Sequence, residues 1–155
     1  SVDGGVIEDV EATHLTLREV TTAPLFLRLG ARLRAPEGAV PGAIRRVAIR
    51  DMTAEDILPD YSALIVGMEG HPVEDVTLER VRLTYRGGGV AVDGTAPEKD
   101  DAYPEPSMFG RTPAYGLWTR HVRGLTLKEV ALSAETPDAR PRTLFEDTTL
   151  HENGA

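Results

Sequence analysis

The chain has 155 residues, and 41% of them are hydrophobic, enough for a single domain with a continuous core. Seventeen Lys and Arg stand against 25 Asp and Glu, and the resulting net charge of −8 argues against nucleic acid and membrane surfaces as partners. Cysteine is absent, which excludes disulfides and thiolate metal sites, and no apolar run approaches the roughly 20 residues of a membrane span.

A frame of apolar and polar residues begins at Ile7 and recurs at Ile44, Val73 and Val122. In each copy the pattern is apolar-x-x-apolar-x-apolar-x-x-apolar-x-apolar. The third copy and its flanks, HPVEDVTLERVRLTYRGGG (71–89), come close to the period of two of a half-buried strand. This stretch therefore predicts a strand, a short corner and a second strand.

A second, shorter apolar run follows each copy of the frame. These runs span residues 25–29, 63–66, 116–118 and 144–145. A constant frame with connections of variable length is typical of a solenoid. We therefore expect an all-β chain that forms one domain over 1–155, a right-handed parallel β-helix of about four coils. The expected coils lie near residues 6–29, 43–70, 71–89 and 116–145.

The longest interruption of the pattern is an excursion over residues 87–115. It opens with Gly87-Gly88-Gly89, which lets the backbone leave the strand but is no phosphate loop, because no Lys-Ser/Thr follows. Loops of this length without secondary structure are usually functional or disordered. A shorter Gly- and Pro-rich excursion spans 30–42, and we expect the polar end, 146–155, to be frayed.

The acidic pairs and the histidines do not predict a catalytic or metal centre. Glu8-Asp9 and Glu74-Asp75 recur at the same place in the frame, whereas a catalytic pair would be unique, so exposed corners are the favoured interpretation. The four histidines stand at no metal spacing. Carboxylates of the excursion could hold a hard cation, although a solvated acidic loop is favoured. Those carboxylates belong to Glu98, Asp100, Asp101 and Glu105. We predict no cofactor.

Aromatic residues and arginines around the excursion are the candidates for sugar binding. Aromatic rings stack on sugars, and arginine binds carboxylates bidentately. The alternative is that the rings only fix the excursion against the flank of the solenoid. The candidate substrate-binding residues are Arg28, Arg32, Arg34, Trp118, Arg120 and His121.

Several blocks of the chain resemble the C-terminal part of bacterial polygalacturonase-like proteins of glycoside hydrolase family 28. The blocks are PLFLRLG (24–30), HPVEDVTL (71–78) with TYRGGG (84–89), and AYPEPSMFG (102–110) with PAYG (113–116). The resemblance covers nearly the whole chain, and the AYPEPSMFG block is its most specific part. It implies a right-handed parallel β-helix that acts on pectic polysaccharide or oligogalacturonide by inverting hydrolysis, in a secreted or periplasmic location.

The family's catalytic motifs, however, are missing. They comprise Asn-Thr-Asp, Asp-Asp, Gly-His-Gly and Arg-x-Lys segments, all upstream of a position that corresponds to Gly4 to Ile7. This chain contains only one of them, Asp100-Asp101, and that pair lies in the excursion. The resemblance therefore implies that the catalytic centre lies before Ser1 and that this chain alone is inactive. It also places a family substrate contact near Arg28 to Arg34.

Three functions stay open at this point. The first is the C-terminal β-helix segment of a pectin hydrolase, which supplies structure and one flank of the sugar cleft. The second is a stand-alone, non-catalytic module for carbohydrate binding or assembly. The third, a polysaccharide lyase, would need a cation and a basic residue, and neither Lys99 nor Lys128 has suitable neighbours.

Assembly follows from the same pattern. The chain starts at Ser1 rather than Met, so we expect that it was processed or cut from a longer protein. A solenoid whose first coil is uncovered exposes an apolar cross-section and an unpaired strand edge. We therefore expect the chain to be held by the rest of a longer protein or to self-associate through its first coil.

Overall fold

The structure is a computed structural model that describes residues 1–34 and 37–151. Its regular elements are seven strands and one short 3₁₀ turn within those ranges. They are β1 (Val6–Val20), β2 (Phe26–Arg28), β3 (Ala43–Ile57), β4 (Ala63–Val66), β5 (Val73–Tyr85), η1 (Pro106–Phe109), β6 (Leu117–Ala134) and β7 (Thr143–Leu150). The prediction of an all-β chain is confirmed.

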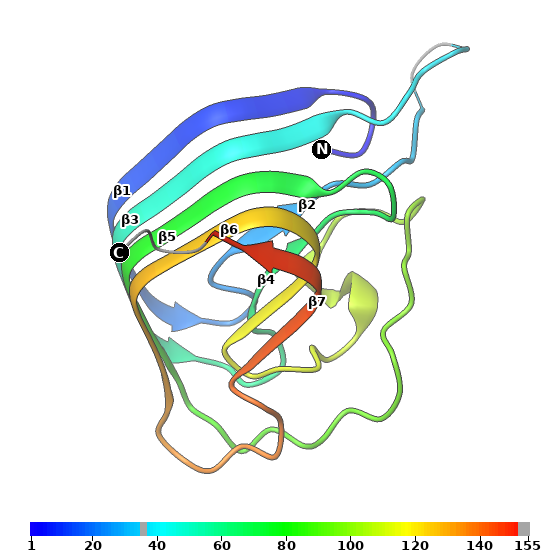
Figure 1. Cartoon of the computed structure of the whole chain (residues 1–155). Coiled ribbons are helices and arrows are strands. Elements are labelled where there is room, and N and C mark those ends of the chain that lie inside the picture. Colours follow the sequence, from blue (N-terminus) through cyan, green and yellow to red (C-terminus); the bar gives the residue numbers. More distant parts are fainter. Residues whose placement is uncertain (35–36, 152–155) are drawn as a thin grey trace.

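The named strands pair in parallel throughout. The long strands follow the order β1-β3-β5-β6, and the short strands continue it as β6-β4-β2. Strand β6 belongs to both parts because its first four residues pair with β4 and the rest pair with β5, while β7 pairs with its other edge. Figure 1 shows the resulting sheet curled into a half-barrel. The predicted parallel arrangement is confirmed.

The repeated frame of the sequence sets the register of the long strands. Equivalent apolar positions lie side by side, as in the row that joins Leu15, Met52, Val81 and Val130. The members of these rows on β3 and β5 form the buried core together with residues of β4 and β6, among them Ile65, Leu117 and Leu125. On β1 the corresponding side chains are more exposed, because no further strand covers them.

Left-handed residues recur every five positions along the long strands, and they were not predicted. Three of them lie in β1 and three in β3, all with φ between 53° and 58°. These residues are Asp9, His14, Glu19, Arg46, Asp51 and Asp56. Each adds one outward-facing residue, as a bulge does, so the inward face stays apolar while the strand bends. The apolar spacing is therefore three, two, three, two rather than a strict period of two.

The structure differs from the predicted strand, corner and strand over residues 71–89. Strand β5 is continuous, and its bends are the single left-handed residues Asp75 and Arg80. Because the left-handed residues stack across strands, all the long strands bend at the same places, and the sheet curls as a unit.

The outer face of the sheet carries rows of alternating charge. One row joins Glu8, Arg45, Glu74 and Arg123. Arg45 Nε lies 2.7 Å from Glu8 Oε2, and Arg46 pairs with Asp9 at 2.6 Å. The acidic pair Glu8-Asp9 thus lies at an exposed corner, where neighbouring strands neutralise it.

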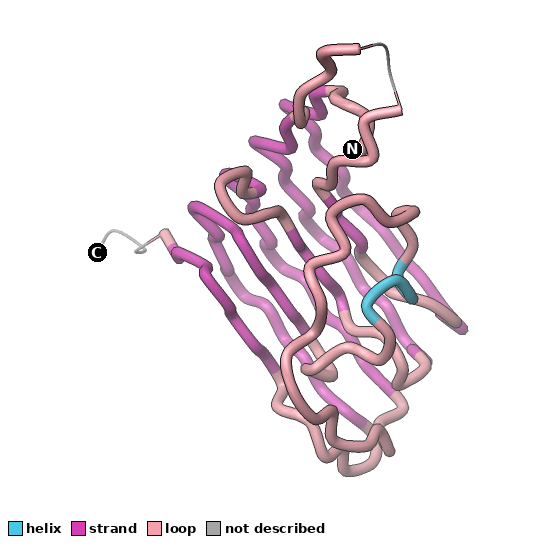
Figure 2. Tube along the Cα trace, turned by 90° about the vertical axis from the view of Figure 1, so that its right-hand side faces the viewer, coloured by secondary structure: helices cyan, strands magenta, loops and turns pink. Residues whose placement is uncertain are grey.

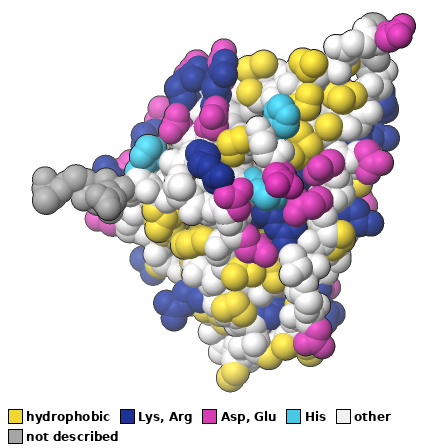
Figure 3. Space-filling view, turned by 45° about the vertical axis from the view of Figure 1, so that its right-hand side comes forward, with side chains coloured by type: hydrophobic (Ala, Val, Ile, Leu, Met, Phe, Trp, Pro, Cys, Tyr) yellow, Lys and Arg dark blue, Asp and Glu magenta, His cyan; other side chains and the backbone are white. Residues whose placement is uncertain are grey.

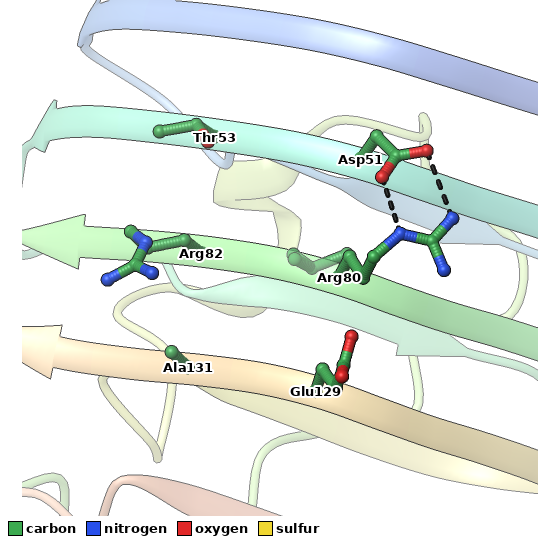
Figure 4. A pocket seen from close by; sticks show the side chains of 7 residues that line it. Asp51, Thr53, Arg80, Arg82, Glu129 and Ala131 are labelled. Carbon is green, nitrogen blue, oxygen red and sulfur yellow. Dashed lines mark hydrogen bonds and ion pairs between the residues drawn. The ribbon is translucent and has the colours of Figure 1, made fainter.

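A second charged row crosses a shallow groove on this outer face. Figure 4 shows Arg80 of β5 joined to Asp51 of β3, with Glu129 of β6 on the other side. The Arg80 Nε to Asp51 Oδ1 distance is 2.6 Å. Exposed pairs add little stability singly. In this row, however, a slip of one residue would place Arg50 opposite Arg80 or Asp51 opposite Glu79, so the row favours the observed pairing.

The C-terminal region differs from the expectation of a frayed end. Residues 146–150 belong to β7, and this part of β7 reaches the segment of β6 around Val122 to Leu125. The apolar run at 144–145 indicated the start of this strand, but the polar residues after it did not predict its continuation to Leu150. Residues 35–36 of the shorter excursion and 152–155 of the expected frayed end lie outside the described residues.

Substitution of Glu129 tests the left-handed positions. Glu129 has φ of 52° in an exposed part of β6. Valine there should destabilise the protein by about 1–2 kcal/mol relative to glycine, because a β-branched residue resists this backbone conformation. Urea unfolding of Glu129→Val and Glu129→Gly measures the difference.

The matched control is Lys128→Val, at the exposed strand residue just before Glu129. It should change the free energy of unfolding by no more than about 0.5 kcal/mol. Equal stability of the two Glu129 variants would contradict the left-handed backbone at this position.

Candidate functional site

The long excursion, residues 87–115, lies against the side of the molecule that carries the short strands (Figure 2). A buried ion pair fixes both of its ends. Asp138 accepts a hydrogen bond from Gly89 N at 2.9 Å, and Arg140 donates to Thr112 O at 3.1 Å. The two side chains lie 2.9 Å apart with no exposed surface. The excursion is therefore an anchored strap across the flank of the sheet.

Arg28, at the end of β2, is buried beneath this strap. Its guanidinium donates to Gly67 O at 2.7 Å and to Glu98 O at 2.9 Å. It also lies 3.3 Å from Asp100 Oδ1 and 5.2 Å from the centre of the Phe109 ring. Burial lowers the pKa of Arg28, and the charge of Asp100 opposes that shift. Arg28 thus holds the middle of the strap to the sheet.

Arg120, on β6, anchors the neighbouring part of the strap. Its side chain is 3% exposed, donates to Ala96 O at 2.7 Å and lies 3.0 Å from a carboxylate oxygen of Glu146. The same Glu146 accepts a hydrogen bond from Trp118 Nε1 at 2.6 Å. Trp118 in turn meets Phe109 edge to face, with ring centres 5.1 Å apart. Aromatic packing and a shared carboxylate therefore fix the position of this arginine.

His121 follows Arg120 directly and lies between two carboxylates. Its Nδ1 is 2.6 Å from Asp147 and its Nε2 is 3.1 Å from Glu98. Hydrogen bonds from His121 and then from Arg123 lower the pKa of Asp147. Figure 3 shows acidic, basic and histidine side chains gathered in the middle of this face.

Four of the predicted sugar-binding residues therefore come together at the strap: Arg28, Trp118, Arg120 and His121. Two of them, Arg28 and Arg120, are buried and bonded to carbonyl groups of the strap. This arrangement matches the alternative in which aromatic residues fix the excursion against the flank. Contact of these four residues with substrate stays a prediction.

Arg32 and Arg34 lie apart from this group. Arg34 is bound to Asp3, and its hydrogen bonds lower the pKa of Asp3 to about 2. The Arg32 guanidinium lies 5.3 Å from the centre of the Tyr103 ring. Tyr103 is 65% exposed, so this cation–π pair is open to solvent. Substrate binding by Arg32 and Arg34 stays a prediction as well.

Glu146 and Phe109 were not among the candidate substrate-binding residues, and Glu98 and Asp100 were weighed in a different role. Glu98 and Asp100 were weighed as cation ligands, yet each faces a guanidinium group. Across residues 1–34 and 37–151, no three His, Asp or Glu side chains converge as a metal site would require. The sequence pointed to Glu98 and Asp100 only through their place in the acidic excursion. It could not predict their contacts with Arg28 and Arg120, because those contacts join positions far apart in the sequence.

Comparison with family models, curated proteins and solved structures finds no match to this chain. Among the described residues, no helix has the length and apolar character needed to cross a membrane.

Replacement of Asp138 tests the anchoring of the strap. Asp138→Asn should destabilise the protein by about 3 kcal/mol, since it leaves the buried guanidinium of Arg140 without its counter-charge. The hydrogen bond from Arg140 lowers the pKa of Asp138. Its stabilising effect is therefore present above the unfolded-state pKa of about 4 and is lost as the pH falls. Denaturant unfolding at several pH values measures both effects.

The control for this series is Asp93→Asn, at an exposed position of the same excursion. It should be neutral at every pH. A cost for Asp138→Asn that stayed constant into acid would contradict the assigned ion pair.

Proposed function

We propose that this chain is a segment of a right-handed parallel β-helix from a polygalacturonase-like pectin hydrolase, where it builds the wall beside the sugar cleft. The observation that carries the proposal is the stacking of the four copies of the frame in parallel register. Strands β1 and β3 each lead into a short strand, β2 and β4, which the chain leaves to begin the next long strand, and β6 leads into β7. Crossovers between parallel strands are right-handed in the great majority of proteins, which supports the proposed hand.

The strap side of the molecule supports a role beside an acidic sugar chain. The exposed Tyr103 ring offers a stacking surface, and the adjacent Arg32 offers a partner for a galacturonate carboxylate. The sequence blocks that resemble the family include this strap. Because the sequence contains only one of the family's catalytic motifs, and that pair, Asp100-Asp101, lies in the excursion, the proposed role is structural and non-catalytic, in a secreted or periplasmic protein.

Incubation of the pure chain with polygalacturonate tests this proposal. We expect no release of reducing ends, because the sequence lacks the family's Asn-Thr-Asp, Gly-His-Gly and Arg-x-Lys segments, and its one Asp-Asp pair lies in the excursion. A catalytically competent polygalacturonase serves as the positive control. Clear turnover by this chain alone would contradict the proposal.

A stand-alone binding module is the second candidate, and the exposed Tyr103 and Arg32 pair favours it. Arg28 and Trp118 are poor positions for a binding test because their removal would disturb the buried strap. Titration of wild type, Arg32→Ala and Tyr103→Ala with oligogalacturonide therefore separates the candidates. A stand-alone module binds and loses affinity in both variants, whereas a purely structural segment binds nothing measurable.

Within the described residues, strand β1 has a free edge, which supports the proposal that a further β-strand pairs with it. Strand β1 lies at the edge of the sheet, and its inward side chains Ile7 and Val10 are 43% and 39% exposed. Such an edge is a template for another strand. We propose that it contacts the rest of a longer protein, and that the isolated chain self-associates through it.

Sedimentation velocity over a range of concentrations tests this contact. Wild type should form larger species as its concentration rises, and Ile7→Lys should shift the chain toward monomer, because a charge at the edge opposes apolar packing. Val90→Lys, at a 55% exposed position of the excursion, is the matched control and should behave as wild type. A wild-type chain that stays monomeric at high concentration would contradict self-association.

A further inference from the structure

We propose that the carboxylate of Glu98 occupies a binding position for a ligand carboxylate between Arg120 and His121, so that the strap competes with acidic ligands for that position. The proposal rests on the proposed function and adds a means of regulating the same flank. The ligand class is a small carboxylate or the carboxylate of an acidic sugar.

The position is built by two consecutive residues of β6. Glu98 Oε1 lies 3.4 Å from Arg120 Nη1, and Glu98 Oε2 lies 3.1 Å from His121 Nε2. Neighbouring residues of a regular strand point to opposite faces. The left-handed backbone of His121, with φ of 53°, interrupts this alternation and lets both side chains address one carboxylate. The two side chains are 3% and 12% exposed, and each also contacts a further carboxylate, Glu146 at Arg120 and Asp147 at His121.

The Glu98 side chain can leave this position while the strap stays in place. Its side chain is 48% exposed, and its contacts with Arg120 and His121 are longer than most charge-assisted hydrogen bonds. Its backbone carbonyl is held separately by Arg28 at 2.9 Å. Arg120 keeps its hydrogen bond to Ala96 O at 2.7 Å without Glu98. The carboxylate is therefore the exchangeable part of the contact.

A second contact nearby also joins a half-exposed carboxylate of the strap to a buried guanidinium. The Asp100 side chain is 48% exposed and lies 3.3 Å from the buried guanidinium of Arg28. Within the described parts of the chain, the buried Nε of Arg28 has no hydrogen-bond partner. The strap thus places two exposed carboxylates on two buried guanidinium groups, as an acidic ligand would. We assign the exchange to Glu98, because there the side chains of Arg120 and His121 both contact one carboxylate.

Removal of Glu98 should free the position for an added ligand. Trp118 is the chain's single tryptophan and lies 5.2 Å from the Arg120 guanidinium, so its fluorescence reports on the site. The probes are galacturonate, oligogalacturonide, acetate and the uncharged sugar galactose. If Glu98 fills the position about nine-tenths of the time, Glu98→Ala should bind galacturonate and acetate about tenfold more tightly than wild type does. Galactose should show no gain.

Two further variants make the result specific. Asp101→Ala removes a neighbouring exposed carboxylate of the same strap and should bind as wild type. Glu98→Gln keeps the size of the side chain and removes its charge, and it should also gain affinity for galacturonate. If thermal unfolding shows that Glu98→Ala loosens the strap, Glu98→Gln replaces it as the variant for the binding test.

The outcomes separate this inference from the proposed function. No gain in galacturonate or acetate binding by either Glu98 variant would overturn the inference, whatever the wild type does with oligogalacturonide. A gain for both carboxylates, with no added affinity for oligogalacturonide over acetate, would support the carboxylate position and count against the pectic ligand. A gain for oligogalacturonide beyond acetate supports both.

Discussion

The left-handed residue at every fifth position of the long strands is the constraint on which the rest of the structure depends. It converts an ordinary alternation into a spacing that keeps one face apolar around a bend. Because the left-handed residues stack from β1 to β6, neighbouring strands curve together and keep their backbone hydrogen bonds. The half-barrel, its buried rows and its charged outer rows all follow from this shared curvature.

The curvature also brings the short strands to the side where the excursion crosses. Buried guanidinium groups bind that excursion through its carbonyl oxygens, which the otherwise irregular backbone leaves unpaired. Arg28, Arg120 and Arg140 thus hold an excursion whose regular structure is limited to the short turn η1. Their placement explains how so long a loop stays ordered, and it leaves the carboxylates of Glu98 and Asp100 facing solvent at the sites of contact.

The sequence predicted the parallel all-β architecture because the frame repeats apolar positions that only stacked strands can bury together. It could not predict the left-handed positions, since Asp9, Arg46 and Asp75 in one such row differ in charge and share no turn signature. The candidate residues around Trp118 were found from their chemistry. The burial of Arg28 and Arg120 was not predicted, because it depends on carbonyl groups of an excursion with no periodic pattern.

The parallel register of the long strands is tested most directly by disulfide cross-linking on the outer face. Ala48 and Thr77 are direct partners on β3 and β5, whereas Ala48 and Glu79 are not. Partner residues lie within the reach of a disulfide. Oxidation of the Ala48→Cys, Thr77→Cys double variant should give a rapid intramolecular cross-link, and the Ala48→Cys, Glu79→Cys variant should give little. Equal or reversed yields would contradict the register and the curved parallel sheet built on it.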